Sequence, residues 1–85
     1  MEYHVIFRTS ALQEFRVLSE DIRNRMAMAV DALKQNPRPF GVRKVIGGEN
    51  LYRIRIGNYR LVYEVDDKKS IILVTRVRHR RDAYR

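Results

Sequence analysis

The residues of this chain whose types and spacing could do chemistry are arginines. Arg53, Arg55 and Arg60 flank a Gly-Asn pair, and three more follow at alternate positions near the end of the chain: Arg76, Arg78 and Arg80. A guanidinium group binds phosphate through paired N–H donors and keeps its charge at any physiological pH. Such a set predicts a site that holds a phosphate group and stabilises the negative charge that develops as it reacts.

The stretch from Leu51 to Val65 must position the first three arginines. Its alternating pattern, interrupted by Gly57-Asn58, predicts two antiparallel strands joined by a two-residue turn, with Arg55 opposite Arg60. One face is expected to be core and the other charged: Tyr52, Ile54, Ile56, Tyr59, Leu61 and Tyr63 on the first, and Arg53, Arg55, Arg60 and Glu64 on the second. Like charges directly opposite each other destabilise a sheet, so this pair indicates an anionic ligand; a solvated outer face is the alternative.

A general base for such a site is an open question. Glu64 shares the arginine face, where it could accept a proton or simply form a structural ion pair. His79 has a suitable ordinary pKa of about 6.5, but strand alternation turns it away from Arg78 and Arg80. His4 and His79 have no partners at ligand spacing, so neither a metal site nor a cofactor is expected.

The charge of the chain is concentrated in its second half. The 85 residues carry a net charge of +8, with six Lys/Arg against five Asp/Glu in residues 1–42 and twelve against five in residues 43–85. This excess favours a nucleic acid as partner, with an acidic protein as a second possibility. The chain has no cysteine, which fits a reducing cytoplasm, and no apolar run long enough to span a membrane.

The rest of the sequence predicts a scaffold for these strands. Residues 3–8 alternate as a first strand, and Ser10 with Gln13 has the spacing of a capping box for a short helix to about Leu18. Ser19 is placed to cap a second helix that ends before Pro37. Residues 40–50 form a loop, or at most a short strand at 42–46, and residues 70–79 form the last strand, whose apolar start suits a central position. The fold class is α+β: a single domain, residues 1–85, with an N-terminal strand, a two-helix hairpin and a three-stranded antiparallel sheet, the helices on one face.

Two stretches carry a resemblance to a known family. Residues 50–64, which contain Tyr-Arg-Leu-Val-Tyr, and residues 78–85, Arg-His-Arg-Arg-Asp-Ala-Tyr-Arg, resemble the RelE branch of the RelE/ParE toxin superfamily, the mRNA interferases. The opening strand and the helix pair fit as well, so the resemblance covers essentially the whole chain. It implies the toxin of a type II toxin–antitoxin system, neutralised by a cognate antitoxin in a hetero-oligomer. The basic charge of the chain indicates that this antitoxin is acidic.

The resemblance also implies an activity and roles for single residues. The activity is that of an endoribonuclease that enters the A site of the 70S ribosome and cuts mRNA without a metal, by attack of the RNA 2′-hydroxyl. Arg60 would stabilise the transition state, Arg80 would hold or protonate the leaving oxygen, and Tyr84 would orient the cleaved nucleotide. Arg53 and Arg55 stand where relatives carry lysines, and arginine anchors phosphate but is a poor general base. The charge pattern, rather than the resemblance, makes five further basic residues candidates for RNA contact: Arg43, Lys44, Arg76, Arg78 and Arg81. For Arg43 and Lys44 a solvated basic loop is the alternative.

Two other functions stay open on the sequence. A ParE-like protein would have the same fold and inhibit DNA gyrase without cutting anything. A non-catalytic relative would only bind its antitoxin. The retained Arg60, Arg80 and Tyr84 favour the nuclease.

Overall fold

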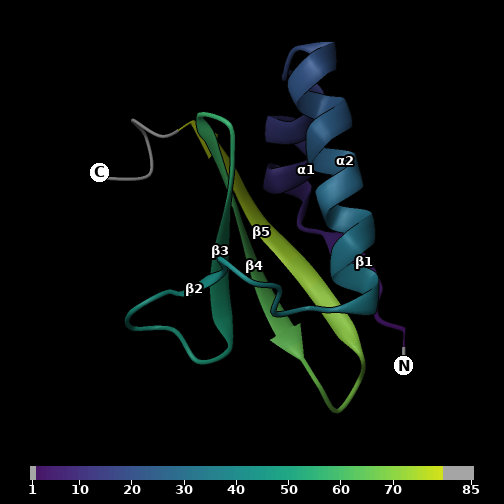
Figure 1. The fold of residues 1–85 in the computed structure, drawn as a ribbon, viewed down its shortest axis with the longest axis vertical. Coiled ribbons are helices and arrows are strands. Elements are labelled where there is room, and N and C mark those ends of the chain that lie inside the picture. Colours follow the sequence, from purple (N-terminus) through teal and green to yellow (C-terminus); the bar gives the residue numbers. More distant parts are fainter. Residues whose placement is uncertain (1, 80–85) are drawn as a thin grey trace.

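A five-stranded sheet with two helices on one face makes up residues 2–79, the part of the chain that this computed structural model describes (Figure 1). The elements along the chain are β1 (His4–Phe7), α1 (Thr9–Arg16), α2 (Glu20–Gln35), β2 (Arg43–Lys44), β3 (Leu51–Ile56), β4 (Tyr59–Asp66) and β5 (Ile71–His79). The α+β class and the placing of both helices on one face agree with the sequence prediction. No helix within residues 2–79 is both long and apolar enough to cross a membrane.

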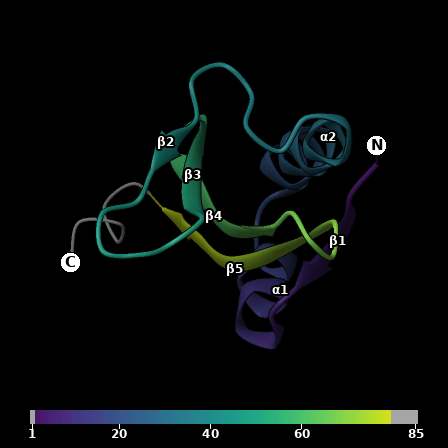
Figure 2. The same ribbon diagram turned by 90° about the horizontal axis from the view of Figure 1, so that it is seen from below.

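The sheet has more strands than the sequence predicts. Its order is β1-β5-β4-β3-β2, so the predicted antiparallel strands β3, β4 and β5 form the centre, and a strand is added at each side (Figure 2). On one side β1 pairs with β5 in parallel, from His4 opposite Ile71 to Phe7 opposite Val74. On the other side β2 pairs with β3. The three-stranded prediction is wrong in this detail. The backbone N–H and C=O groups along both edges of the apolar strand β5 need partners, and strand alternation does not identify which segments supply them.

Neither helix is capped at its N-terminus by a hydrogen bond from a side chain. Arg8 is the N-cap of α1, in extended conformation, and its N–H donates to the carbonyl of Val74 at 2.9 Å as a continuation of β1. The predicted capping box at Ser10 is therefore wrong, and α1 ends at Arg16 rather than near Leu18. Ser19 is the N-cap residue of α2 as predicted, although its side chain makes no capping hydrogen bond.

The core lies between the helices and the inner face of the sheet. On β4, Leu61, Tyr63 and Val65 are buried, and they pack in one cluster with helix residues such as Met26 and Leu33. The alternate residues of β4 therefore face away from the helices. The predicted hairpin register is confirmed in full, with a turn in which Gly57 takes a φ of +60°.

A β-bulge in β5 decides which face its arginines occupy. Tyr63 pairs with Val74, but Val62 pairs with Arg76, so Thr75 is an extra residue on β5. Before the bulge Val74 faces the core, and after it Val77 does. Arg76 and Arg78 are thereby turned to the outer face, opposite Val62 and Arg60. Without the bulge, even-numbered residues would continue to face the core.

A hydrogen-bonded clasp holds the connection between α2 and β2 against the sheet. Arg38 pairs with Asp67 through its two terminal guanidinium nitrogens, Nη1 and Nη2, at 3.3 and 2.8 Å, and its Nε donates to the Tyr52 hydroxyl at 2.9 Å. The Tyr3 hydroxyl donates to the same carboxylate at 2.7 Å. Nearby, the Tyr63 hydroxyl donates to the Pro37 carbonyl at 2.7 Å, and burial raises the pKa of Tyr63 to about 12. The clasp thus joins the residue before β1, strand β3 and the turn between β4 and β5 to this connection.

The clasp predicts a pH dependence of stability. The hydrogen bonds from Arg38 and then from Tyr3 lower the pKa of Asp67 below its ordinary value of 3.8. A lowered pKa in the folded state stabilises the protein above the unfolded-state pKa, and this contribution is lost as the pH falls through the folded-state pKa. We expect Asp67→Asn to lower the urea midpoint at pH 7 and the difference from the wild type to vanish in acid. A difference that persists unchanged at pH 2 would contradict the ionic origin of the effect.

Candidate functional site

The outer face of the sheet carries arginines in two adjacent cross-strand rows. Arg43 on β2 lies opposite Arg53 on β3, and Arg55 on β3 lies opposite Arg60 on β4. Residues that are direct partners project to the same face of a sheet. Four guanidinium groups from three strands therefore share one side of the sheet, and the helices cover the other.

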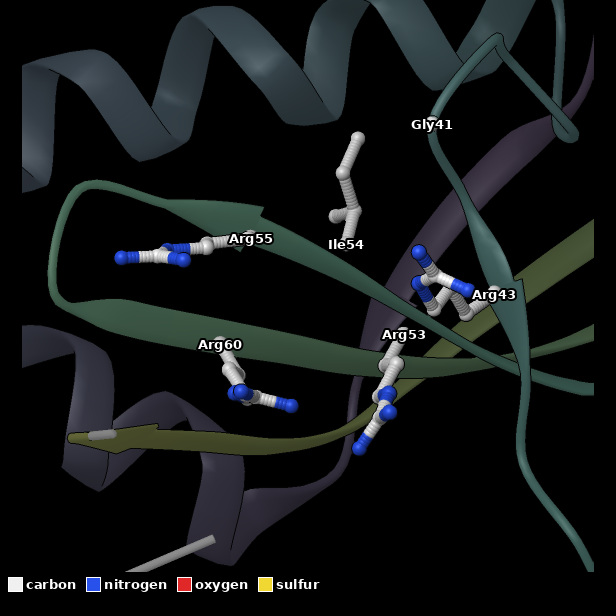
Figure 3. A pocket seen from close by; sticks show the side chains of 6 residues that line it. All are labelled: Gly41, Arg43, Arg53, Ile54, Arg55 and Arg60. Carbon is white, nitrogen blue, oxygen red and sulfur yellow. The ribbon is translucent and has the colours of Figure 1, made fainter. Parts of the chain in front are cut away.

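These four arginines line one pocket. It has a volume of about 400 Å³, and its remaining described lining is Gly41 and Ile54. Figure 3 shows the arginine side chains gathered over the strands while Ile54 points the other way, toward the helix. None of these lining residues is acidic. The pocket is a concave, cationic surface on which an anion would be held by several N–H donors at once.

Two local features hold Arg55 and Arg60 in this arrangement. The Arg55 Nε donates to the Gly57 carbonyl at 3.1 Å, which ties this exposed side chain to the hairpin turn. Arg60 is half-buried and its Nε is shielded from solvent. A charge that is partly removed from water interacts more strongly with a ligand than one on a long exposed side chain. Arg60 is therefore the lining residue best suited to stabilise charge during a reaction.

Of the other predicted RNA-contacting residues, the three that the structure describes are not among the lining residues of the pocket. Arg76 is exposed on the outer face opposite Val62. Lys44 lies on the opposite face of β2 from Arg43 and borders the loop of residues 45–49. Arg78 lies opposite Arg60, but its Nε forms an ion pair with Glu14 of α1 at 2.9 Å.

Glu14 is a residue that the sequence patterns did not single out. The pairing of β1 with β5 ends at Val74, and beyond it Glu14 accepts the Val77 N–H at 2.9 Å through Oε1 while Oε2 faces Arg78. One carboxylate thus accepts a hydrogen bond from the edge of β5 that β1 no longer covers, and it positions an arginine next to the catalytic candidate Arg60. Only the tertiary contact of α1 with β5 reveals this, because a glutamate in the middle of a helix carries no distinguishing signal.

Substitution of Glu14 separates these two contacts. Glu14→Ala removes the acceptor of the partly buried Val77 N–H, and an unsatisfied group of this kind costs about 1–3 kcal/mol of unfolding free energy. Glu14→Gln keeps a side-chain oxygen for that bond and loses only the charge facing Arg78. We therefore expect urea denaturation to show a clearly larger decrease in unfolding free energy for Glu14→Ala than for Glu14→Gln. Equal losses would assign the effect to the ion pair instead.

The candidate bases are located outside the pocket. Glu64 is exposed, opposite Leu51 and Leu73, and within residues 2–79 it makes no ion pair with an arginine. His79 is opposite Tyr59, and the two rings meet edge to face with centroids 5.1 Å apart. His79 therefore lies on the face of Tyr59 and away from that of Arg78, as alternation predicts. The roles of Glu64 and His79 stay predictions, and Arg80, Arg81 and Tyr84 lie outside the described residues.

Comparison with known proteins relates the sequence and fold of this chain to toxins. The family model described as "ParE toxin of type II toxin-antitoxin system, parDE" matches residues 5–84. The mRNA interferase toxin RelE of Escherichia coli (strain K12) is 32% identical over 88 residues, which cover 99% of this chain and 92% of that protein.

Solved structures agree with the sequence comparison. The toxin in the archaeal RelE–RelB complex from Pyrococcus horikoshii OT3 superimposes with a TM-score of 0.83 at 29% identity, covering 94% of this chain and 97% of that one. A chain of the intact E. coli RelBE toxin–antitoxin complex superimposes with a TM-score of 0.82 at 30% identity, covering 91% of this chain and 95% of that one. The similarity extends over nearly the whole chain in both cases.

Proposed function

Since this chain belongs to the ParE toxin family of type II toxin–antitoxin systems, and is RelE-like within it, we propose that it is an endoribonuclease that cuts mRNA in the ribosomal A site. The observation that carries the proposal is the pocket lined by Arg43, Arg53, Arg55 and Arg60. A nuclease that uses the 2′-hydroxyl of RNA needs to hold and polarise one phosphate, and this pocket offers the donors for both tasks. The RelE of E. coli, which is named an mRNA interferase, supports the same reading.

The proposed reaction is a transesterification within the RNA. The 2′-oxygen forms a bond to the adjacent phosphorus, the bond from phosphorus to the 5′-oxygen breaks, and the products are a 2′,3′-cyclic phosphate and a 5′-hydroxyl end. Arg60 stabilises the extra negative charge on the pentacoordinate phosphorus, and Arg53 and Arg55 anchor the phosphate. By the resemblance to RelE, Arg80 serves the leaving oxygen and Tyr84 orients the nucleotide. The group that removes the 2′-proton is not assigned, with Glu64 and His79 as the candidates.

Two macromolecular partners belong to the proposal. The ribosome would present the mRNA in the conformation that aligns the 2′-oxygen with the scissile bond, because arginines that hold a phosphate do not by themselves fix the position of the 2′-oxygen. An antitoxin is the second partner, since similar toxins were solved in complex with RelB. Charge complementarity to the arginine face indicates that its binding segment is acidic and that salt slows its association.

The test is to add the purified protein to translating ribosomes and to map the mRNA ends. We expect cuts within the codon of the A site and 2′,3′-cyclic phosphate termini, while naked mRNA is cut far more slowly. If the mRNA stays intact and the protein inhibits supercoiling by DNA gyrase, the ParE-like function replaces this proposal. Intact mRNA with gyrase unaffected would leave antitoxin binding alone.

Cleavage is also expected to need no metal bound by the protein. Within residues 2–79, no cluster of three or more histidine and acidic side chains could hold a metal ion, and arginines supply the positive charge instead. Removing transition metals with a chelator and restoring the magnesium that ribosomes require should leave the cleavage rate unchanged. A rate that falls and returns on adding zinc or manganese would contradict the mechanism.

A further inference from the structure

Phe40 is a fully exposed aromatic residue with no role in the core. Its relative exposure is 106%, and the other large apolar residues that are exposed within residues 2–79 are all aliphatic: Ile6, Val17, Met28 and Ile46. The ring contributes no burial to folding, so its removal should hardly change stability. A single exposed apolar residue is common on protein surfaces, and Phe40 becomes informative only through where the chain places it.

The chain places Phe40 at the tip of a tight turn. The Val42 N–H donates to the Pro39 carbonyl at 3.1 Å, and Gly41 has a φ of +91°, as the third residue of a type II turn requires. Just before the turn, the Asn36 side chain accepts the Arg38 N–H at 3.2 Å, and Arg38 is fixed by Asp67. The turn is thus anchored at its base, and Phe40 is its second residue.

The same turn forms part of the arginine pocket. Gly41 lines the pocket directly, as does Arg43 two residues later. Because no peptide bond is cis, the Cα atom of Phe40 lies about 3.8 Å from that of Gly41. Figure 3 shows Gly41 on the segment that passes over the strands to Arg43. A fully exposed aromatic residue therefore directly precedes, in the chain, a residue that lines the arginine pocket.

This juxtaposition matches how proteins bind single-stranded nucleic acid. Cationic side chains hold the backbone, and an adjacent planar side chain stacks on an unpaired base. We propose that Phe40 is a stacking platform for a base of single-stranded RNA whose neighbouring phosphate occupies the arginine pocket. The inference rests on the proposed function and deepens it, because it names a residue that recognises the substrate. Since every base has a flat face, Phe40 would contribute affinity with little sequence preference.

Kinetics on ribosomes programmed with mRNA test the inference. Loss of one base–aromatic stack weakens binding by about 5- to 150-fold, so Phe40→Ala should raise by that factor the toxin concentration that gives the half-maximal single-turnover rate. The rate at saturating toxin should change much less. Phe40→Trp should keep wild-type binding, and Ile46→Ala, which removes a similarly exposed aliphatic side chain from the loop between β2 and β3, should have no effect.

A fluorescence measurement reads the stack directly. The chain contains no tryptophan, so Phe40→Trp and Ile46→Trp each introduce a single reporter. Titration with a short single-stranded oligoribonucleotide should quench the emission of Trp at position 40 in a saturable way and leave that at position 46 nearly unchanged. Urea denaturation of each variant verifies that it is folded as stably as the wild type.

The outcomes separate the inference from the proposed function. If the wild type cuts mRNA and Phe40→Ala cuts with the same concentration dependence, the inference is wrong and the proposed function stands. If Ile46→Ala weakens binding as much as Phe40→Ala does, Phe40 acts as one apolar surface contact among others, and the stacking proposal is wrong. A loss of affinity for the antitoxin alone would assign Phe40 to that interface instead. If the wild type leaves mRNA intact on the ribosome, both the function and the inference fail.

Discussion

Arg60→Ala is expected to slow single-turnover mRNA cleavage by about 10²–10³-fold, the usual effect of losing one preorganised charge donor at a reacting centre. Arg53 and Arg60 are the two half-buried arginines of the pocket, and the Nε of Arg60 is in addition shielded from solvent. Arg60 is the second residue of β4, and pairing with Arg55 on β3 and Arg78 on β5 leaves its backbone little freedom. A mobile lysine elsewhere could not replace it, because the charge must already be in place when the phosphorus becomes pentacoordinate. The measurement is the rate of mRNA cutting at saturating toxin on programmed ribosomes.

The fold should survive this substitution. Arg60 projects from the outer face of the sheet, so the core residues and the hairpin register are unaffected. Circular dichroism and urea denaturation should therefore match the wild type closely. Arg16→Ala is the matched control, because it removes an exposed arginine from the end of α1, on the helix side of the molecule. If Arg60→Ala cuts mRNA at the wild-type rate, the proposed nuclease mechanism is wrong. If Arg60→Ala and Arg16→Ala lose the same amount of activity, the effect comes from the overall charge of the protein and not from the position of Arg60.

The next residue along β4 should behave in the opposite way. Leu61 has no exposed surface and packs between the sheet and the helices, so Leu61→Ala should lower the unfolding free energy by about 2–5 kcal/mol. This is a large share of the stability of a domain of this size, which is typically about 5–15 kcal/mol. The measurement is equilibrium unfolding in urea.

Activity should separate Leu61 from Arg60. The fraction of Leu61→Ala that remains folded should cut mRNA at the wild-type rate when rates are scaled to folded protein. Val62→Ala is the control, since Val62 is only half-buried on the outer face and should cost much less stability. If Leu61→Ala cuts more slowly than the wild type per folded molecule, Leu61 affects the site directly, and its role is not limited to stabilising the fold.

Much of this protein was determined by local patterns in its sequence. The Gly57-Asn58 turn fixed the register of β3 and β4, because a two-residue loop leaves no freedom to slip, and the opposition of Arg55 and Arg60 follows from it. Strand alternation separated Leu61 from Arg60 by face, and proline after Asn36 ended α2 where expected. These features depend on neighbours along the chain, so they can be read without knowing the fold.

The tertiary structure decided what depends on distant segments. The entry of Arg43 into the pocket required β2 to pair with β3, and the capture of Arg78 by Glu14 required α1 to lie along the free edge of β5. The face of Arg76 and Arg78 depended on one extra residue, Thr75, whose hydroxyl donates to the Val62 carbonyl at 3.2 Å within the bulge. Alternation has a period of two, so a single inserted residue reverses every side chain beyond it. The bulged register buries Val77 in the core and keeps Arg76 and Arg78 out of it, and both effects favour it over the regular register.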